Sequence, residues 1–590
     1  SVTLFNVKIN NIVKCLTQGI QCSLYVDDFV ICYRSAYIPV MERALQNTIN
    51  KLQVWTHENG FHISRSKTVA VHFCNLRSSH RDPELFLYDS PIKLVNQNKF
   101  LGVIFDRKLS FVPHIKELKK KCLKALNILK VVGHYDWGAD RKTLLALYHA
   151  LIRSKLDYGC IVYGSARSSY RKILDPVQNQ ALRICLGAFR TSPAVAMHVE
   201  ANELSLDRRR EQLAAQYVLK IKTDHKNPAY DCLFDTEYAH RYENTNNIRP
   251  LGIRMELFFE TLEEEMKVDL SSLHPSKVPP FPPWHYFPPA IYLPADDQVK
   301  NLTNPIVFRQ NFYDLRYNKL ADRLAIFTDG LKAENHVGAA AVVKHKFFVR
   351  RLPDGSSVYS AELIALELAL NYIIESHHSK FVIFSDSLSS LKALKGYNFA
   401  NPILQIVIQK YIQATTDFQK DIVFCWVPSH VGIYGNELAD FTAKAALEAN
   451  LSHTLVPYTD YRGCIKQFVR KQWQEWWNLC QDVKIWEVKP LLGEWSSSYR
   501  TSRREEIILS RLRIGHSYVT HSHILRGEPP PLCEHCGEPL TIKHILIECT
   551  FFIGLRTNYY NVSCLRDLFA LTDPTKIFQY LKCINMFHKI

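Results

Sequence analysis

Residues 324–447 constrain the fold most, because their apolar runs change period in a fixed order. Three short runs with strand character are followed by helical and strand patterns in alternation. The predicted strands are Leu324–Thr328, Ala339–Val343, Phe347–Leu352, Phe381–Ser385 and Ile422–Val427, and the predicted helices are Ala361–Ile374, Leu388–Lys395, Pro402–Thr415 and Asn436–Leu447. This order predicts one α/β domain with a mixed five-stranded sheet and flanking helices.

Four acidic residues occupy prominent positions in this domain. Asp329 follows the first predicted strand, Asp386 follows the fourth, and Asp440 lies in the last helix. Glu362 shares a helix stripe with Leu366, Ala369 and Ile373, which predicts that it faces the sheet. A single Asp at a strand end is usually only a helix cap. Carboxylates that converge at the ends of strands without a neighbouring cation, however, suit Mg²⁺, and two such ions can hold a phosphodiester.

The strings around these acids resemble the type 1 ribonuclease H domain of jockey-like non-LTR retrotransposons. They are IFTDG, SAELIALELAL, FSDSLSSLKAL and WVPSHVGIYGNELAD. The resemblance implies that the four acids bind two Mg²⁺ ions, with Mn²⁺ as a substitute, and that His430 assists proton transfer and product release. The resemblance also implies that Glu437 is a weaker accessory acid. The implied reaction is endonucleolytic hydrolysis of the RNA strand of an RNA–DNA hybrid. Leu331 departs from the small polar residue found in relatives, which puts one substrate contact in doubt.

The first part of the chain carries YVDD between two apolar runs, with Asp27 and Asp28 in a tight turn. A pair of Asp in a turn is often only a turn. HENGFHISRSKT and KFLGVIFDRKLSF follow in the order seen in reverse transcriptases of the same elements, which the chain resembles up to about residue 225. By that resemblance the two acids belong to a catalytic palm, and Lys67 lies near the incoming nucleotide. The residues implied to lie by the primer are Phe100, Leu101 and Gly102.

A lysine-rich helix is predicted after Pro113. Its apolar stripe predicts one buried face, while Lys116, Lys120 and Lys124 lie on another. The lysines suit either a solvated face or contacts with nucleic-acid phosphates, and the position of a polymerase thumb favours phosphate. The formal charge of +16, from 73 Lys and Arg against 57 Asp and Glu, likewise indicates polyanionic partners, here RNA, DNA and their hybrid.

The segment 274–294 is rich in Pro and aromatic residues, which excludes a helix or a central strand. It is predicted to be a strap packed along a neighbouring surface, with a Pro-rich peptide ligand as the alternative. No apolar run is long enough to span a membrane and no secretory pattern is present, so we expect an intracellular protein without membrane contact, in nucleus or cytoplasm. The chain begins with Ser, not Met, which suggests a fragment.

The last part of the chain holds a compact cluster of the form Cys-x2-Cys-x7-His-x4-Cys. Its members are Cys533, Cys536, His544 and Cys549, which predicts a structural, four-coordinate Zn²⁺ knuckle. Upstream, Arg511 and Arg513 lie in an arginine-rich segment that we expect to contact nucleic acid. The nearby tryptophans have helical spacing and favour a core position over base stacking.

These features predict a multidomain chain of α/β and α parts. The predicted divisions are a partial reverse-transcriptase palm (1–112), a helical thumb or connection (113–225), a linker with the strap (226–321), the ribonuclease H domain (322–449) and a basic region with a small zinc-knuckle tail (450–590). A nucleic-acid-binding protein that has lost catalysis, derived from the same kind of element, is the alternative.

The polymerase site implied by the resemblance lacks one member. The family's palm also needs an aspartate from an earlier strand, and residues 1–26 contain no Asp or Glu. We therefore predict that this chain does not extend a primer. Incorporation of dNTPs on a primed RNA template tests this, and robust extension would overturn the prediction.

Overall fold

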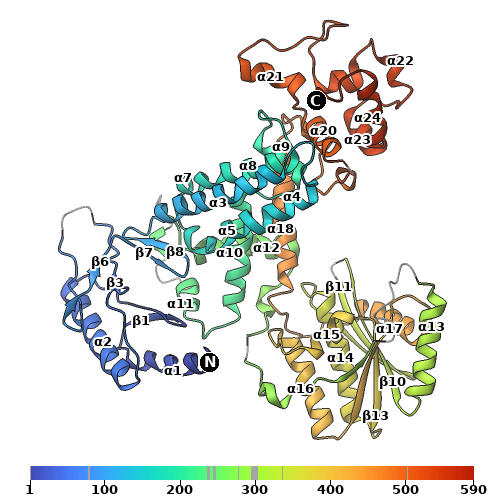
Figure 1. Cartoon of the computed structure of the whole chain (residues 1–590). Coiled ribbons are helices and arrows are strands. Elements are labelled where there is room, and N and C mark those ends of the chain that lie inside the picture. Colours follow the sequence, from blue (N-terminus) through green and yellow to red (C-terminus); the bar gives the residue numbers. More distant parts are fainter. Residues whose placement is uncertain are drawn as a thin grey trace. The chain divides into compact units, whose positions relative to one another are not determined.

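The computed structural model describes residues 2–76, 80–235, 239–242, 248–276, 278–293, 303–334, 336–500 and 502–590. The chain divides into two compact units (Figure 1). One unit combines Ser1–Arg210 with Gln474–Ile590, and the other is Glu211–Trp473. Segments from both ends of the chain therefore share one unit, and the predicted α/β domain lies in the other.

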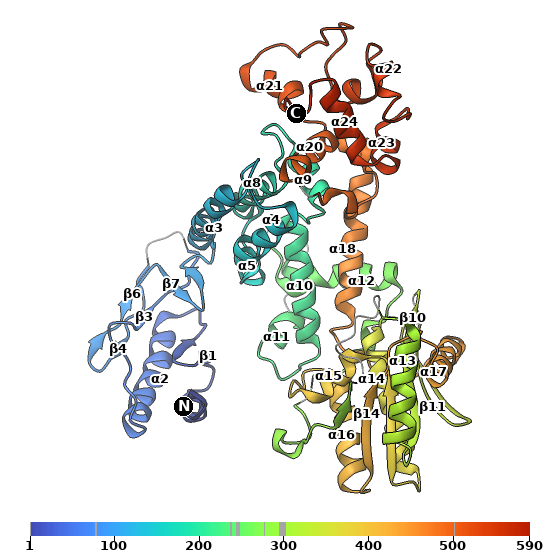
Figure 2. The same ribbon diagram turned by 45° about the vertical axis from the view of Figure 1, so that its right-hand side comes forward.

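The centre of the 211–473 unit is a mixed sheet with the strand order β12-β11-β10-β13-β14-β9 (Figures 1 and 2). The first three strands pair antiparallel and the remaining neighbours pair parallel. The strands are β9 (Ala290–Tyr292), β10 (Leu324–Ala333), β11 (His336–Val343), β12 (Lys346–Leu352), β13 (Lys380–Ser385) and β14 (Asp421–Trp426). All five predicted strands are present, but the predicted count of five is wrong.

The sixth strand, β9, comes from the Pro-rich segment. It pairs with β14 through only three residues, and prolines flank it, so it lacks the length and pattern of an ordinary strand. Proline is tolerated at the edge of a sheet, where one side of the strand needs no partner. Phe281 and Tyr286 are buried in the core of the unit, and the Tyr286 hydroxyl donates to the main-chain oxygen of Leu394. The described part of this segment thus packs as a strap.

Helices cover both faces of the sheet. One core joins the sheet to α14 (Val358–Glu375), α15 (Leu388–Lys395) and α16 (Pro402–Thr416), and a second joins the opposite face to α13 (Pro305–Asp314). The last helix, α17 (Tyr434–Ala445), packs on β10 and β11 (Figure 2).

Local sequence signals explain where these helices begin. The Ser357 hydroxyl accepts from the Ser360 amide at the start of α14, and the Asn401 side chain accepts from the Ile403 amide before α16, where Pro402 occupies the first turn. Such caps satisfy amides that the helix itself leaves unpaired. The cap at Ser357 fixes the start of α14, and Glu362 is the fifth residue of this helix.

The rest of this unit is helical. Its elements are the larger part of α10 (Leu206–Lys222), α11 (Ala229–Phe234), α12 (Leu251–Met266) and the first part of α18 (Tyr461–Asn478). Phe258 of α12 packs edge to face on Phe468 of α18, and Lys471 pairs with Glu265 at 2.8 Å. The acidic stretch near residue 260 therefore lies on a helix that packs against α18.

The N-terminal part of the other unit consists of helices and two-stranded pairs rather than one large sheet. The pair β1–β2 contains YVDD at its turn, and β7–β8 contains the Phe100–Gly102 segment. The elements are α1 (Val2–Ile9), β1 (Gln21–Tyr25), β2 (Asp28–Cys32), α2 (Ile38–Glu58), β3 (Val69–Ala70), β4 (Phe86–Leu87), β5 (Ser90–Pro91), β6 (Lys93–Leu94), β7 (Gln97–Phe100) and β8 (Val103–Asp106).

Helices follow from residue 112 onward. In α3 the predicted stripe from Ile115 to Leu129 is buried, as expected from its spacing. The helices are α3 (Val112–Val132), α4 (Arg141–Tyr148), α5 (Ser154–Asp157), α6 (Cys160–Tyr163), α7 (Ser168–Arg171), α8 (Asp175–Leu186), α9 (Ala194–Ala201) and the first residues of α10 (Leu206–Lys222). Residues 143–155 are helical, but their centre, His149–Arg153, is a π-helix.

The 474–590 part of this unit is built of α19 (Ile485–Val488), α20 (Arg503–Ile514), α21 (Tyr518–Arg526), α22 (Ile553–Arg556), α23 (Leu565–Leu571) and α24 (Pro574–Cys583). Its helix α20 joins the earlier helices through buried charges. Glu200 of α9 lies 2.7 Å from Arg141 and 3.4 Å from Arg513, and the side chains of Glu200 and Arg513 are 0% exposed.

Arg513 was expected to contact nucleic acid, and this prediction is wrong. Its guanidinium donates to the hydroxyls of Ser497 and Ser498 and lies 3.7 Å from the ring centroid of Trp495. A buried cation needs an acidic or hydrogen-bonding partner. The sequence shows only that arginines cluster, and it does not show that Glu200, more than 300 positions away, buries one of them.

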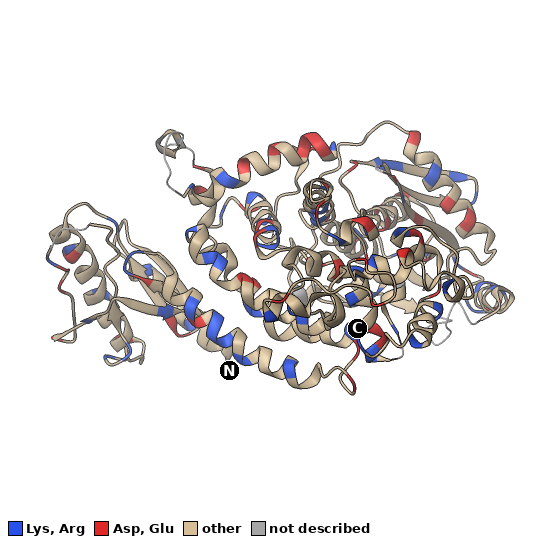
Figure 3. Ribbon diagram, turned by 90° about the horizontal axis from the view of Figure 1, so that it is seen from above, with Lys and Arg blue, Asp and Glu red and all other residues tan. Residues whose placement is uncertain are grey.

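Lys and Arg are distributed along many of the helices and interspersed with Asp and Glu (Figure 3). The excess of positive charge is therefore spread over the described chain. No described helix is long and apolar enough to cross a membrane.

Replacing Glu200 with Gln is expected to destabilise the unit that contains it by about 3–5 kcal/mol, because two buried guanidiniums lose their charged partner. Chemical denaturation followed by circular dichroism measures the change. Glu58→Gln, at an exposed acid of the same unit, is the control and should shift the free energy of unfolding by less than about 0.5 kcal/mol. Equal stability of the two variants would contradict a structural role for the buried network.

Candidate active site and metal centres

The pairing of β10 with β13 brings two of the predicted acids together. Thr328 is paired with Ser385 in a parallel register, so the next residues, Asp329 and Asp386, lie side by side. Parallel pairing stops there, while β10 continues to Ala333 along β11. Asp329 therefore lies within a strand, not at its end as the sequence suggested.

A close approach of backbones places Glu362 against the same point. A Cβ atom at Gly330 would lie 2.4 Å from the Glu362 amide nitrogen and 2.7 Å from the Ala361 carbonyl carbon. Only glycine fits there, because this backbone cannot move away without displacing α14. The glycine after Asp329 thus sets the distance between the strand and the helix that carries Glu362.

The carboxylates of Asp329, Glu362 and Asp386 converge. Each offers a ligand oxygen, and these oxygens lie within 4.8 Å of one another. Asp329 and Glu362 are buried, and the Glu362 Oε2 atom is buried without a hydrogen-bond partner among the described residues. An unpaired carboxylate oxygen inside a protein is costly, and three acids at this separation repel one another unless bound protons or a cation neutralise them.

Two side chains that the sequence analysis did not single out position Asp386. Asn436 at the start of α17 donates from Nδ2 to Asp386 Oδ2 at 3.2 Å, and Trp426 donates from Nε1 to the Asp386 main-chain oxygen at 3.1 Å. Both residues belong to the string WVPSHVGIYGNELAD. Their polar atoms were the available signal, but only the folded structure shows that they face Asp386.

Asp440 and His430 lie beside this group but outside it. Asp440 of α17 pairs with Lys444 at 2.7 Å, one helical turn away. His430 is exposed in the loop before α17, with a left-handed φ of 53°, and its charge favours the ionised form of Asp386. The structure therefore brings the carboxylates of three acids close together, whereas the fourth, Asp440, forms an ion pair with Lys444.

The electrostatics fit a cation site. Burial, followed by the charges of Asp386 and Asp440, raises the pKa of Asp329 to about 7. Burial and the charges of Asp386 and Asp329 raise the pKa of Glu362 well above its usual range. Burial also raises the pKa of Asp386, against the hydrogen bond from Asn436. Carboxylate oxygens in a small, partly buried cluster are the ligands that Mg²⁺ prefers.

The predicted cysteine and histidine cluster is also assembled. Ligand atoms of Cys533, Cys536, His544 and Cys549 lie within 4.8 Å of one another, and Cys536 Sγ is 3.3 Å from His544 Nε2. Burial opposes ionisation of Cys533, but the amides of His535 and Cys536 outweigh it and lower the pKa of this thiol to about 6. Gly537 adopts a left-handed φ of 72° that closes the turn. A thiol of low pKa at neutral pH is prepared to bind a metal.

The residues of the implied polymerase site do not form such a cluster. Asp27 and Asp28 are exposed in the turn of β1–β2, and Lys67 is exposed in a turn before β3. Leu101 and Gly102 form the two-residue turn of β7–β8, and the Tyr158 hydroxyl donates to the Leu101 oxygen at 2.7 Å. In the described ranges, Asp27 and Asp28 belong to no group of three ligands close enough to share an ion.

The lysines predicted to bind phosphate are available. Lys116, Lys120 and Lys124 are exposed on α3, opposite its buried stripe. Arg511 is partly buried, and its guanidinium donates to the main-chain oxygens of Gly187 and Ile590.

A further group of ligand-type residues was not predicted: His72, Cys74 and His80. The guanidinium of Arg107 lies 3.0 Å from His80 Nε2 and 2.7 Å from Asp82 Oδ1, which also bonds to His72 Nδ1. A resident arginine disfavours a metal cation at this distance. We interpret the group as a hydrogen-bonded cluster.

Two stretches of the chain match known families. Residues 321–448 match RNase H, and residues 1–105 match reverse transcriptase (RNA-dependent DNA polymerase). The first match contains the whole carboxylate group, and the second contains YVDD.

Similar curated proteins come from mobile elements. A retrovirus-related Pol polyprotein from the type-1 retrotransposable element R1 of Nasonia vitripennis is 26% identical over 37% of this chain and 65% of its own length. A probable RNA-directed DNA polymerase from transposon X-element of Drosophila melanogaster is 27% identical over 28% and 18%, respectively. An RNA-directed DNA polymerase from mobile element jockey of Drosophila funebris is 28% identical over 30% and 19%. The chain thus aligns with less than two thirds of each of these relatives.

Among solved structures, the ribonuclease H1 of the halophilic archaeon Halobacterium salinarum NRC-1 is 24% identical. The match covers 21% of this chain and 98% of that protein, with a TM-score of 0.18.

Asp329→Asn is expected to stabilise the protein at pH 8 without divalent cations. The pKa of Asp329 in the folded protein, about 7, exceeds the ordinary value of 3.8, so the wild type loses stability as the pH rises from about 4 to 7, and the variant avoids this loss. We expect a gain of about 1–3 kcal/mol at pH 8 and none below pH 4. Thermal denaturation across pH measures it, with the exposed Asp417→Asn as control. A destabilised Asp329→Asn at pH 8 would contradict the repulsion.

Proposed function

We propose that this chain, which carries a reverse-transcriptase segment and a ribonuclease H domain of non-LTR retrotransposon polyproteins, hydrolyses the RNA strand of RNA–DNA hybrids. The observation that carries the proposal is the convergence of Asp329, Glu362 and Asp386 within 4.8 Å, with one buried oxygen of Glu362 unpaired. A structural role would not need three acids to face one another without a basic partner. Within the described ranges no Lys or Arg forms an ion pair with these three residues.

The donor set supports Mg²⁺ as the cofactor, held by Asp329, Glu362 and Asp386, with Asp440 as a further ligand once it leaves Lys444. Two ions are proposed, and Mn²⁺ would substitute because it also accepts oxygen ligands. When bound, such ions lower the pKa of water and neutralise the charge that develops on phosphate oxygens.

The side chains around the acids have distinct roles in this proposal. Asn436 and Trp426 each donate a hydrogen bond to Asp386 and hold it in place, so that Asp386 need not reorient when a metal ion binds. His430, exposed and close enough to act on the charge of Asp386, would give a proton to the leaving 3′ oxygen or help release the product. Lys444 would neutralise Asp440 until cations occupy the site.

The substrate in this proposal is a hybrid duplex, with RNA distinguished from DNA by its 2′-hydroxyl. Leu331 is only partly buried on β10, two residues beyond Asp329. Its side chain offers no hydrogen bond to a ribose. Contacts to the 2′-hydroxyl must then come from backbone groups or other side chains.

The Cys533, Cys536, His544 and Cys549 cluster is proposed to bind structural Zn²⁺. Two Sγ atoms in a short turn, a third Sγ and one imidazole fill a tetrahedral site and leave no position for a reacting molecule. The lowered pKa of Cys533 supports this, because thiolates are the ligating form. For the polymerase segment we propose no primer extension by this chain, since among the described residues Asp27 and Asp28 belong to no group of three possible metal ligands.

Purified protein with Mg²⁺ is expected to cut the RNA of a labelled hybrid and to leave DNA duplex and RNA duplex intact. Asp386→Asn should lower the rate at least about 100-fold, because it replaces a charged carboxylate ligand with a neutral amide. Asp417→Asn, an exposed acid in the same domain, is the matched control and should cut at the wild-type rate. Equal cutting by Asp386→Asn would refute the assignment. A wild-type protein that binds hybrid without cutting it would support the catalytically degenerate alternative.

Removal of the proposed zinc is expected to unfold the surrounding loop and lower RNA affinity. Cys549→Ser should lose close to one equivalent of zinc and its hydrogen-exchange protection between residues 530 and 550, since the metal supplies much of the local folding energy. Cys583→Ser, at an exposed cysteine of the same region, should retain both. Full protection and unchanged RNA binding after verified zinc loss would argue against a structural metal.

A further inference from the structure

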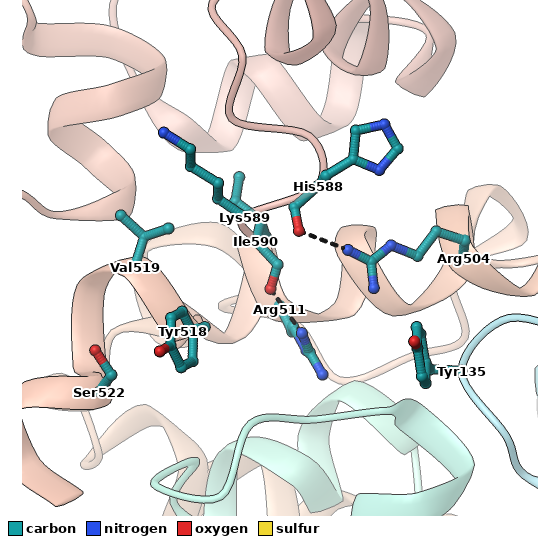
Figure 4. Close-up of a pocket in the computed structure, with 9 residues that line it drawn as sticks. All are labelled: Tyr135, Arg504, Arg511, Tyr518, Val519, Ser522, His588, Lys589 and Ile590. Atoms are coloured by element: carbon teal, nitrogen blue, oxygen red, sulfur yellow. Dashed lines mark hydrogen bonds between the residues drawn. The ribbon is translucent and has the colours of Figure 1, made fainter.

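A basic pocket lies in the unit formed by Ser1–Arg210 and Gln474–Ile590, apart from the residues of the proposed nuclease site. Its volume is about 670 Å³, which is the size range of nucleotide and drug-sized ligand sites. Figure 4 shows the residues that line it. They are Tyr135, Arg504, Arg511, Tyr518, Val519, Ser522, His588, Lys589 and Ile590.

The pocket carries three permanent positive charges and no acidic side chain in its lining. Arg504 donates to the main-chain oxygen of His588 at 3.0 Å, and Arg511 donates to that of Ile590 at 2.6 Å (Figure 4). The His588 acceptor is a neutral carbonyl, which orients Arg504 but leaves its charge uncompensated. The Arg504 Nε atom is buried without a partner among the described residues.

The guanidiniums of Arg504 and Arg511 both carry a positive charge and repel each other. Burial and the charges of Arg504 and Arg503 lower the pKa of Arg511 to about 10. The two guanidiniums are nevertheless fixed by the main-chain oxygens of His588 and Ile590 and by that of Gly187, which accepts from Arg511 Nε at 2.9 Å. A fixed pair of guanidiniums matches the oxygens of a phosphate. An anion would therefore relieve the repulsion in this pocket.

Two tyrosines supply aromatic faces at the pocket. Tyr135 and Tyr518 are 50% and 51% exposed. Arg504 lies 5.7 Å from the ring centroid of Tyr135, and the hydroxyl of Tyr518 accepts from Arg526 at 2.6 Å. Each ring is thus held by an arginine and still accessible. Aromatic faces among cationic groups are the arrangement by which proteins bind unpaired bases next to their phosphates.

We propose that this pocket binds single-stranded nucleic acid, with one phosphate between Arg504 and Arg511 and the adjacent base on Tyr518. Lys589 would contact a neighbouring phosphate. The inference deepens the nucleic-acid function proposed above, but its residues lie outside the ribonuclease H domain, so either assignment can fail without the other. A duplex presents no free base faces to the tyrosines, so the pocket should prefer single strands.

The test is the fluorescence anisotropy of a labelled ten-nucleotide RNA titrated with the full chain. Arg504→Gln is expected to weaken binding at least about fivefold and to reduce the slope of log affinity against log salt by about 0.7, the value for one lost phosphate contact on a single strand. Arg566→Gln, which removes the same charge from an exposed position on α23, is the matched control and should retain the wild-type affinity and slope. Equal affinities for the two variants would overturn the proposal.

A second pair of variants separates stacking from charge. Tyr518→Leu is expected to weaken binding at least about fivefold with an unchanged salt slope, whereas Tyr518→Phe, which keeps the ring, should bind like the wild type. Equal binding by Tyr518→Leu and Tyr518→Phe would also overturn the proposal. This comparison does not depend on whether the Arg504→Gln variant folds.

Further arms of the titration distinguish ligands. Single-stranded DNA of the same sequence should bind within about threefold of RNA, since no 2′-hydroxyl contact is proposed. An acidic peptide of equal charge should compete weakly, because it offers no base to Tyr518. Stronger competition by the peptide than by the oligonucleotide would identify the pocket as a protein-docking site and reject the nucleic-acid assignment. Hybrid cleavage, measured separately, reports on the ribonuclease H proposal alone.

Discussion

The repulsion among Asp329, Glu362 and Asp386 is the constraint on which the proposed chemistry depends. The folded sheet and α14 bring the carboxylate oxygens of these acids within 4.8 Å of one another, although burial disfavours their charges. The parallel register of β10 and β13 fixes the two aspartates, and the missing side chain of Gly330 admits the helix that carries the glutamate. Stability is thus lost at this point, and a cation bound there would restore it.

Much of this domain follows from its sequence because its signals are local. The five longer strands, the helix boundaries near 388–395 and 402–416, and the buried position of Glu362 all follow from period and capping. Long-range pairing is less visible. The strand β9 has three residues between prolines, and only its pairing with the edge of β14 makes it a strand. The contacts of Asn436 and Trp426 with Asp386 likewise depend on which polar atoms meet after folding.

In the 474–590 segment, the partners of charged residues likewise could not be predicted from the sequence. A run containing Arg503, Arg504, Arg511 and Arg513 suggests one function for all four, yet the structure separates them. Arg513 pairs with Glu200, Arg503 donates to the oxygens of Ile184 and Cys185, and Arg504 and Arg511 line the basic pocket. The cysteine and histidine cluster could be recognised because its four residues are close in sequence. The partners of Arg503 and Arg513 could not, because Ile184, Cys185 and Glu200 belong to helices more than 300 residues earlier.

The central claim is that three carboxylates of one sheet and one helix bind a divalent cation. Anomalous diffraction from crystals soaked in Mn²⁺ tests it most directly, since the ion itself is located. The account predicts a peak between the oxygens of Asp329, Glu362 and Asp386, lost in crystals of Asp386→Asn. Ordered carboxylates with no peak between them, or side chains that point apart, would contradict it.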